Sequence, residues 1–276
     1  MMTKYVPPIS RRNYGRSHGY VDGNGQKMPG VTTILGDGLP KKALINWAAN
    51  ATAEYAVDNW EELSGLSMTE RLKKLQGGRY GVTDKAKKRG TEVHGYGERL
   101  VKGEAVKNVP AELRGHVEAY TRFLDAFQVD PIAVEFTVAS YRFGYAGTGD
   151  LIADLVDPAD PEGDPVRWLL DLKTNEKGIY GETALQLAAY RYADVIVVDG
   201  EEKPMIPVER TGAIHITASS ADLIPTVSEE QQLKDFRYAQ QIKRWDSESR
   251  ELILAAVEPP ETTRMVAKVD WAEVQA

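Results

Sequence analysis

The sequence contains no cysteine among its 276 residues. Disulfide bonds, cysteine-ligated zinc and iron–sulfur clusters are therefore excluded, because each requires thiolate sulfur. Long apolar runs are also missing: no stretch approaches the about 18 apolar residues of a membrane-spanning helix, and the first residues lack the apolar core of a signal peptide. We therefore expect a cytoplasmic protein with no membrane partner.

Positive charge is in deficit, with 34 Lys and Arg against 41 Asp and Glu and a net charge of −7. The deficit is uneven. Residues 1–110 hold 18 Lys and Arg against 11 Asp and Glu, a balance of +7, which leaves −14 for residues 111–276. This asymmetry predicts a basic N-terminal face beside an acidic remainder. Nucleic acid is not excluded as a partner, because only the groove that binds it must attract phosphate.

The N-terminal part predicts a loose arm followed by helices. Residues 1–30 are rich in Gly, Arg, Asn and Pro, with a hairpin-like turn at 20–25. A short β-branched segment follows at 29–34, and a helix is expected from Pro40 to about residue 60.

Three further helices are expected before the first long strand. Ser67 and Glu70 have the spacing of a capping box, and Gly77 and Gly78 should end the helix that it opens. A second helix should run from residue 83 or 84 to 102, carrying a basic run and His94, and a third should begin at Pro110. The helices before residue 85 form a predicted N-terminal addition.

The remainder predicts an α/β fold with a mixed central sheet flanked by helices. A core of this size is supported by an apolar content of 42%. The expected strands are 132–142, with Val134, Phe136 and Val138 on one face, and 146–156, 166–173, 195–198 and 213–217. Helices are expected at 183–194 and 228–256, and a tail should follow at 259–276.

The strongest chemical pattern lies on two consecutive strands. Gly147 and Gly149 precede Asp150, and the apolar strand 166–173 ends in Asp171-Leu172-Lys173. Residues two apart on a strand share a face, so Asp171 and Lys173 point to one spot and Leu172 to the opposite layer. Carboxylates there can hold a hard divalent cation, and the ammonium can contact a phosphate oxygen or an attacking water.

Each part of this pattern also has an ordinary structural interpretation. Asp171 and Lys173 alone could form a surface ion pair, and Asp150 could be a turn residue after glycine. Asp154 lies about 13 Å farther along the strand and is interpreted as a distal surface acid. Gln186 and Tyr190, four apart on a helix, could form a core hydrogen bond.

The ordered set resembles the PD-(D/E)xK nuclease superfamily, and the spacing of Gln186 and Tyr190 is similar to its RecB-type exonuclease branch, which includes CRISPR-associated RecB-like and phage recombination exonucleases. The resemblance covers residues 85–194. It implies a restriction-endonuclease-like core at 85–258, after an N-terminal region at 1–84 and before the tail. The four-cysteine cluster that several such relatives carry is absent.

The resemblance also implies roles for individual residues. Metal ligands would be His94, Asp150, Asp171 and the Leu172 carbonyl, with Mg²⁺ or Mn²⁺ as the ion. Lys173 would be catalytic beside Asp150 and Asp171, and Glu135 would support the site. Contacts to DNA would come from the side chains of Gln186, Tyr190, Arg89 and Lys88.

The resulting hypothesis is a metal-dependent exonuclease that hydrolyses linear DNA in recombination, repair or replication. By the same resemblance a phage protein would act in the host cytoplasm, beside a single-strand annealing protein or as a homo-oligomer. A non-cutting DNA-binding recombination accessory that keeps the fold is the alternative. A magnesium phosphotransferase is weaker, because no glycine loop stands between a strand and a helix with the required lysine.

Overall fold

The computed structural model describes residues 7–14, 17–176 and 178–257. The chain divides into two compact units, residues 1–243 and 244–276, and both β-sheets lie in the first. The predicted tail at 259–276 lies outside the described residues. The expected boundary after residue 84 falls inside helix α4 (Met68–Val101).

The expectation of a loose N-terminal arm is wrong. The strands β1 (Ser10–Tyr14), β2 (Ser17–Val21) and β3 (Lys27–Met28) form an antiparallel three-stranded sheet. Asp22 closes the turn between β2 and β3, because its carboxylate accepts hydrogen bonds from the backbone N–H groups of Asn24 and Gln26. We refer to β1–β3 as the N-terminal sheet.

The β-branched segment after the N-terminal sheet is helical rather than extended. Helix α1 (Val31–Gly38) buries Val31, Ile34 and Leu35, so tertiary packing overrides the β-propensity of its residues. Helix α2 (Lys42–Asp58) follows, close to the expected range, and none of its residues is fully buried.

Helix α4 is continuous where a break was expected. The capping box of Ser67 and Glu70 is confirmed at its start, and α3 (Trp60–Ser64) precedes it. The glycine pair lies inside the helix, and a Cβ at Gly78 would come within 2.5 Å of the Tyr55 ring. Gly78 therefore allows α2 to pack closely on α4, and no new helix starts at residue 83 or 84.

The central sheet is mixed and seven-stranded, as expected for an α/β fold, with the order β10-β9-β6-β5-β4-β7-β8. Its strands are β4 (Asp130–Ser140), β5 (Tyr145–Leu155), β6 (Val166–Lys173), β7 (Val195–Val198), β8 (Glu201–Pro204), β9 (Arg210–Ile216) and β10 (Ala221–Thr226). Only the β6–β9 pair is parallel among these neighbours. The sequence analysis missed β8 and β10.

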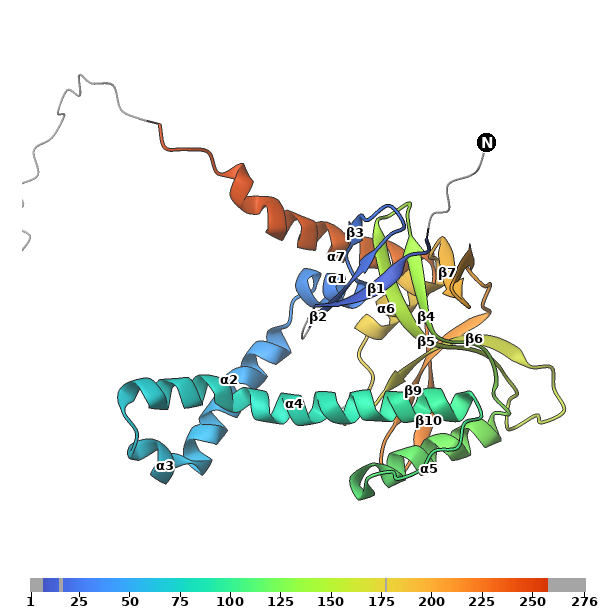
Figure 1. Cartoon of the computed structure of the whole chain (residues 1–276), viewed down its shortest axis with the longest axis horizontal. Helices are drawn as coiled ribbons and strands as arrows, with labels where there is room; N and C mark the ends of the chain where they lie inside the picture. The colour runs from blue at the N-terminus through green and yellow to red at the C-terminus, as the bar shows by residue number, and fades with distance from the viewer. Residues whose placement is uncertain (1–6, 15–16, 177, 258–276) are drawn as a thin grey trace, which may run out of the picture. The chain divides into compact units, whose positions relative to one another are not determined.

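Helices cover both faces of this sheet (Figure 1). Helices α1, α6 (Glu182–Arg191) and α7 (Glu230–Glu248) contribute to the core on one face. Helices α4 and α5 (Ala111–Ala126) contribute to the core on the other. Side chains of β6 alternate between the two cores: Leu169 packs in the first, and Leu170 and Leu172 pack in the second. Leu172 therefore lies on the layer opposite Asp171, as predicted.

Strand β4 departs from the expected alternation. Phe136 and Val138 pack in the first core, whereas Val134 packs against the second. The change of face occurs at Glu135, whose φ of +50° lies in the left-handed region. The expectation that Val134, Phe136 and Val138 share one face is therefore wrong, and the irregularity lies beside Asp150.

The C-terminal part of the described chain continues α7 into a short 3-10 helix, Ser249–Leu252. Phe236 and Ala239 of α7 are buried in the first unit. Within the ranges described above, no helix combines the length and apolar character needed to cross a membrane.

Candidate active site

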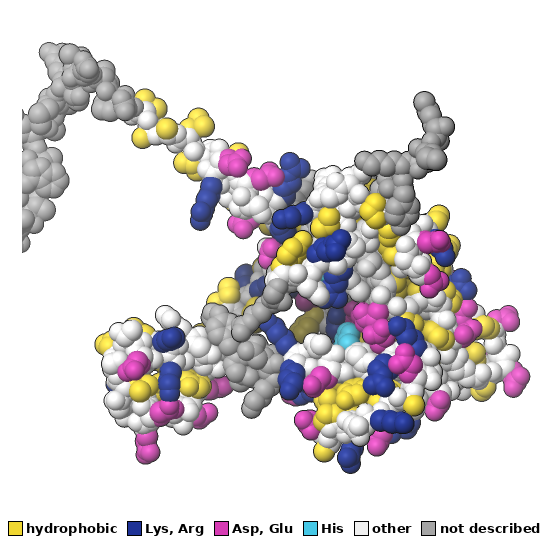
Figure 2. All heavy atoms as spheres, viewed as in Figure 1, with side chains coloured by type: hydrophobic (Ala, Val, Ile, Leu, Met, Phe, Trp, Pro, Cys, Tyr) yellow, Lys and Arg dark blue, Asp and Glu magenta, His cyan; other side chains and the backbone are white. Residues whose placement is uncertain are grey.

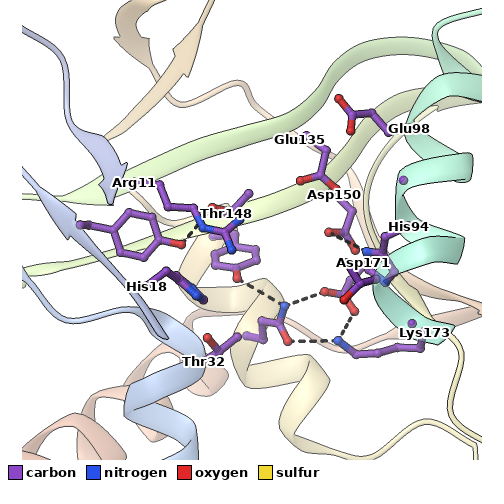
Figure 3. A pocket seen from close by; sticks show the side chains of 16 residues that line it. Arg11, His18, Thr32, His94, Glu98, Glu135, Thr148, Asp150, Asp171 and Lys173 are labelled. Atoms are coloured by element: carbon purple, nitrogen blue, oxygen red, sulfur yellow. Dashed lines mark hydrogen bonds and ion pairs between the residues drawn. The ribbon is translucent and has the colours of Figure 1, made fainter. Parts of the chain in front are cut away.

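Five elements of the chain bring the predicted site residues to one cavity of about 480 Å³. Strands β4, β5 and β6 and helices α4 and α6 each supply part of its wall (Figure 3). The predicted residues that line the cavity are His94, Glu135, Asp150, Asp171, Lys173, Gln186 and Tyr190.

Three of the predicted residues do not line this cavity. The side chain of Leu172 is buried in the core, and its carbonyl remains only a predicted ligand. Arg89 forms an ion pair with Glu176, and the well-exposed Lys88 lies 3.9 Å from Glu92. Nothing in these contacts assigns Arg89 or Lys88 to DNA, so that role stays a prediction.

Asp150 is held in place by the backbone of the neighbouring strand. The N–H of Leu172 donates to Asp150 Oδ2 at 2.6 Å. The backbone pairing of β5 with β6 reaches Leu151 and Leu170 but not Asp150. The Asp150 carboxylate therefore accepts the backbone N–H of β6 that a strand carbonyl would otherwise bind. The other oxygen, Oδ1, lies 3.6 Å from Nδ1 of His94. It therefore faces the cavity.

Asp171 is almost fully buried, at 3% exposure, and belongs to a polar network. Its Oδ1 accepts a hydrogen bond of 2.6 Å from Gln186 Nε2, and its Oδ2 lies 2.5 Å from Lys173 Nζ. Gln186 also accepts from Lys173 and lies 3.3 Å from the Tyr190 hydroxyl. Asp171 and Lys173 thus lie on one face of β6, as predicted, with Asp171 buried and the Lys173 side chain 31% exposed rather than as a surface pair.

Burial governs the electrostatics of this pair. It raises the pKa of Asp171, an effect that the neighbouring Lys173 only partly offsets. Burial acts to lower the pKa of Lys173, but the Asp171 carboxylate outweighs it and the pKa is raised. Lys173 therefore remains an ammonium at neutral pH. Asp171 Oδ2 is buried and, among the described residues, has no hydrogen-bond partner besides this ion pair.

A second group in the cavity can hold a metal ion. One nitrogen of His94 and one carboxylate oxygen each from Glu135 and Asp150 all lie within 4.8 Å of one another. One imidazole and two carboxylates suit a divalent cation. Within the described residues Asp171 is not part of this group, so Glu135, expected only in a supporting role, takes the place expected for Asp171.

The groups around Asp150 shift one another's pKa values. Burial, followed by the charge of Asp150, raises the pKa of Glu135 to about 7. Burial acts to lower the pKa of His94, but its interaction with Asp150 outweighs this and raises it. The left-handed backbone of Glu135, a conformation that costs about 1–3 kcal/mol, places this carboxylate beside Asp150. Observed strain of this kind is typical of functional positions.

The glycines around Asp150 make room for two rings. A Cβ at Gly147 would lie 2.3 Å from Tyr190 Cε1, and one at Gly149 would lie 2.5 Å from Phe136 Cζ. The close approach that the sequence indicated is therefore made by the protein's own side chains. Tyr190, at 1% exposure, packs against β5 and supports Gln186, so its structural role is as a positioning residue.

Sequence reasoning missed the contribution of the N-terminal sheet to this cavity. Arg11, His18 and Tyr20 line it, together with Thr32 of α1 and Thr148 of β5. The available signal was the hairpin-like turn at 20–25, which joins β2 to β3, whereas β1 has no apolar alternation that would mark it as a strand.

Asp154 is confirmed as remote from the cavity. Arg167 donates to its two carboxylate oxygens at 2.9 and 3.0 Å, in a bidentate ion pair. This acid stands on the same strand as Asp150 but has a structural partner.

Comparison with known proteins adds no assignment, since no family model matches the chain and no curated protein matches it significantly.

Proposed function

We propose that this protein is a metal-dependent nuclease that hydrolyses phosphodiester bonds of linear DNA as an exonuclease. The observation that carries the proposal is the meeting of Glu135, Asp150 and Asp171 with Lys173 in one cavity. Carboxylates can hold a divalent cation that hydrolyses a phosphodiester, and a neighbouring lysine can stabilise the charge on the phosphate. The mixed sheet with helices on both faces is compatible with a restriction-endonuclease-like core.

Mg²⁺ or Mn²⁺ is the proposed ion, and His94, Glu135 and Asp150 would hold it. Mg²⁺ prefers carboxylates and water, and imidazole is acceptable to Mn²⁺, which makes Mn²⁺ the better first choice in an assay. Such an ion, when bound, would lower the pKa of a coordinated water and offset charge on the phosphate. Asp171 lines the same cavity, where its carboxylate is paired with Lys173 and accepts a hydrogen bond from Gln186.

The protein's own groups complete the chemistry. The Lys173 ammonium would donate to a non-bridging phosphate oxygen and stabilise the charge that develops there. Its partners Asp171 and Gln186 hold it in position, and Tyr190 holds Gln186. A preorganised donor of this kind lowers the barrier because it needs no rearrangement during the reaction.

Charge around the cavity is compatible with a DNA strand. A histidine is visible in a hollow of the surface, with Lys and Arg side chains and acidic side chains both reaching its rim (Figure 2). Residues 1–110, which carry a net charge of +7, include both α4 and the N-terminal sheet. Only this region, rather than the whole acidic protein, has to attract phosphate.

The test is digestion of end-labelled linear duplex and of covalently closed circular duplex with Mg²⁺, Mn²⁺ or EDTA. Wild-type protein is compared with Asp171→Asn and with the control Asp154→Asn. We expect metal-dependent loss of linear DNA alone, absent in Asp171→Asn and unchanged in the control. DNA binding without digestion of any substrate would favour the non-cutting accessory protein instead.

A further inference from the structure

The N-terminal sheet is packed firmly against the central sheet beside the cavity. The Tyr20 hydroxyl and Thr148 Oγ1 are 2.9 Å apart, and Thr148 stands two residues before Asp150. Tyr20, Met28 and Ile9 share a buried cluster with Ala139 and Ala146 of the central sheet. The N-terminal sheet is therefore held beside the cavity by packing and by a hydrogen bond.

The register of β1 with β2 determines which side chains those are. Arg11 pairs with Tyr20 and Asn13 with His18, whereas Arg12 pairs with Gly19. Since neighbouring residues of a strand alternate between faces, Arg11 shares its face with Tyr20 and His18, and Arg12 points the other way. In Figure 3, Arg11 and His18 enter the cavity from the side opposite Asp150 and Lys173.

Arg11 differs from the other basic side chain of the cavity. Lys173 is paired with Asp171, but the guanidinium of Arg11 has no hydrogen bond or ion pair with any of the described residues. A guanidinium presents a planar fork of donors that matches phosphate oxygens. An unpaired guanidinium in a wall opposite a group of carboxylates is suited to an anionic part of the ligand.

His18 complements this guanidinium. Burial, followed by the charge of Arg11, lowers the pKa of His18, so its ring is neutral at neutral pH and can donate one hydrogen bond. Its ring stands edge-on to Tyr20 with centroids 5.8 Å apart, which fixes its orientation. The two walls of the cavity therefore differ: one can bind a cation and the other can bind an anion.

We propose that Arg11 and His18 form a phosphate-binding subsite for the phosphate group next to the scissile one on the DNA strand in the cavity. This subsite rests on the proposed function, because it identifies the scissile phosphate with the position between Lys173 and the His94 group. A cavity of about 480 Å³ falls in the usual range of about 300–1,000 Å³ for small-ligand sites, so it can admit one nucleotide with its neighbouring phosphate.

The test compares Arg11→Gln with Arg12→Gln, the same change one residue along on the opposite face. Binding of a short single-stranded oligonucleotide is measured by fluorescence anisotropy with Ca²⁺ in place of the catalytic ion. Arg11→Gln should weaken binding about tenfold, as expected for a lost charge-assisted hydrogen bond, and reduce the salt slope by about one. Arg12→Gln should stay within about twofold of wild type, and His18→Gln should weaken binding about threefold.

Neutral methylphosphonate linkages, introduced one at a time, locate the contact. In wild-type protein, a methylphosphonate at one position beside the scissile phosphate should weaken binding by the same factor as Arg11→Gln. In Arg11→Gln the same linkage should cause no further loss, because the two changes remove one interaction. Losses that simply multiply would overturn the subsite.

Digestion with Mn²⁺ separates this inference from the proposed function. Arg11→Gln should raise KM about tenfold and leave kcat within about threefold of wild type. If Arg11→Gln matches Arg12→Gln in both binding and KM, the subsite is wrong although the nuclease stands. If wild type binds through Arg11 but cuts no DNA, the nuclease is wrong, and Arg11 binds a DNA phosphate that has no cleaved neighbour. If it neither binds nor cuts, both are wrong.

Discussion

The side-chain amide of Gln186 donates a hydrogen bond of 2.6 Å to the buried carboxylate of Asp171. The same amide accepts from Lys173 Nζ, so one glutamine contacts both members of the buried ion pair. A buried carboxylate that loses its donor is destabilised, because water cannot replace the hydrogen bond. Gln186 is thus a positioning residue for Asp171 and Lys173.

Replacing Gln186 by leucine should therefore affect both stability and rate. We expect a loss of about 1–3 kcal/mol in the free energy of unfolding, from the unsatisfied carboxylate. Cleavage of DNA should fall about tenfold to a hundredfold, as for other residues that orient catalytic groups. Urea denaturation and initial rates measure the two effects.

The matched control is Gln231→Leu, because Gln231 is exposed on α7 and bonds only to Asp235 among the described residues. It should leave both measurements near wild type. If Gln186→Leu behaved like this control, the polar network would have no role in holding the ion pair.

Asp150→Asn should remove metal binding while the control Asp154→Asn retains it. Both aspartates stand on β5, but only Asp150 belongs to the group with His94 and Glu135. Mn²⁺ at about a hundred times its Kd should stabilise wild type by about 2.7 kcal/mol and Asp150→Asn far less. Thermal unfolding with and without Mn²⁺ measures this. Equal stabilisation of wild type and Asp150→Asn would place the ion elsewhere.

Much of the central sheet follows from local sequence. Strands β6 and β7 have the predicted limits, because β7 is a continuous apolar run and β6 is built around the apolar run Trp168-Leu169-Leu170. The placing of Asp171 and Lys173 on one face follows from the two-residue period of a strand. These features depend on neighbours in the chain and could be read without tertiary contacts.

The remaining features depend on contacts between distant residues. The left-handed conformation of Glu135 changes the face of β4, and no residue near it in sequence signals this. Gly78 looks like a helix breaker until the Tyr55 ring is found against it. Arg11 enters the cavity only because the N-terminal sheet packs beside β5. Each of these was misassigned or missed for that reason.

The raised pKa of Glu135 predicts how the stability of the metal-free protein depends on pH. Because its pKa is about 7 in the folded protein and lower in the unfolded chain, folding favours the protonated carboxyl. The corresponding stability is fully present below the unfolded value and is lost as the pH rises through about 7. In EDTA, the melting temperature should therefore fall between pH 5 and pH 8.

Glu135→Gln should flatten this dependence, because glutamine does not titrate. Glu112→Gln, at an exposed position on α5, is the control and should keep the wild-type profile. The affinity of wild type for Mn²⁺ should rise from pH 6 to pH 8, since the ion competes with the proton on Glu135. Calorimetry measures that affinity. A profile of Glu135→Gln identical to wild type would contradict the assignment.

Gly147→Ala should disturb the site without changing any polar group. Its Cβ would lie 2.3 Å from the Tyr190 ring, which is fully buried and cannot move outward. We expect a loss of about 1–3 kcal/mol in unfolding free energy, typical of overpacking, together with slower DNA cleavage as Tyr190 displaces Gln186.

Gly36→Ala is the control: a Cβ there meets no atom within 4 Å, and the helical position should gain up to about 1 kcal/mol. The double change Gly147→Ala with Tyr190→Leu should recover part of the lost stability, because it removes the ring from the position that the new methyl group occupies. If the double variant were less stable than the two single losses predict, the contact between Gly147 and Tyr190 would not be the cause.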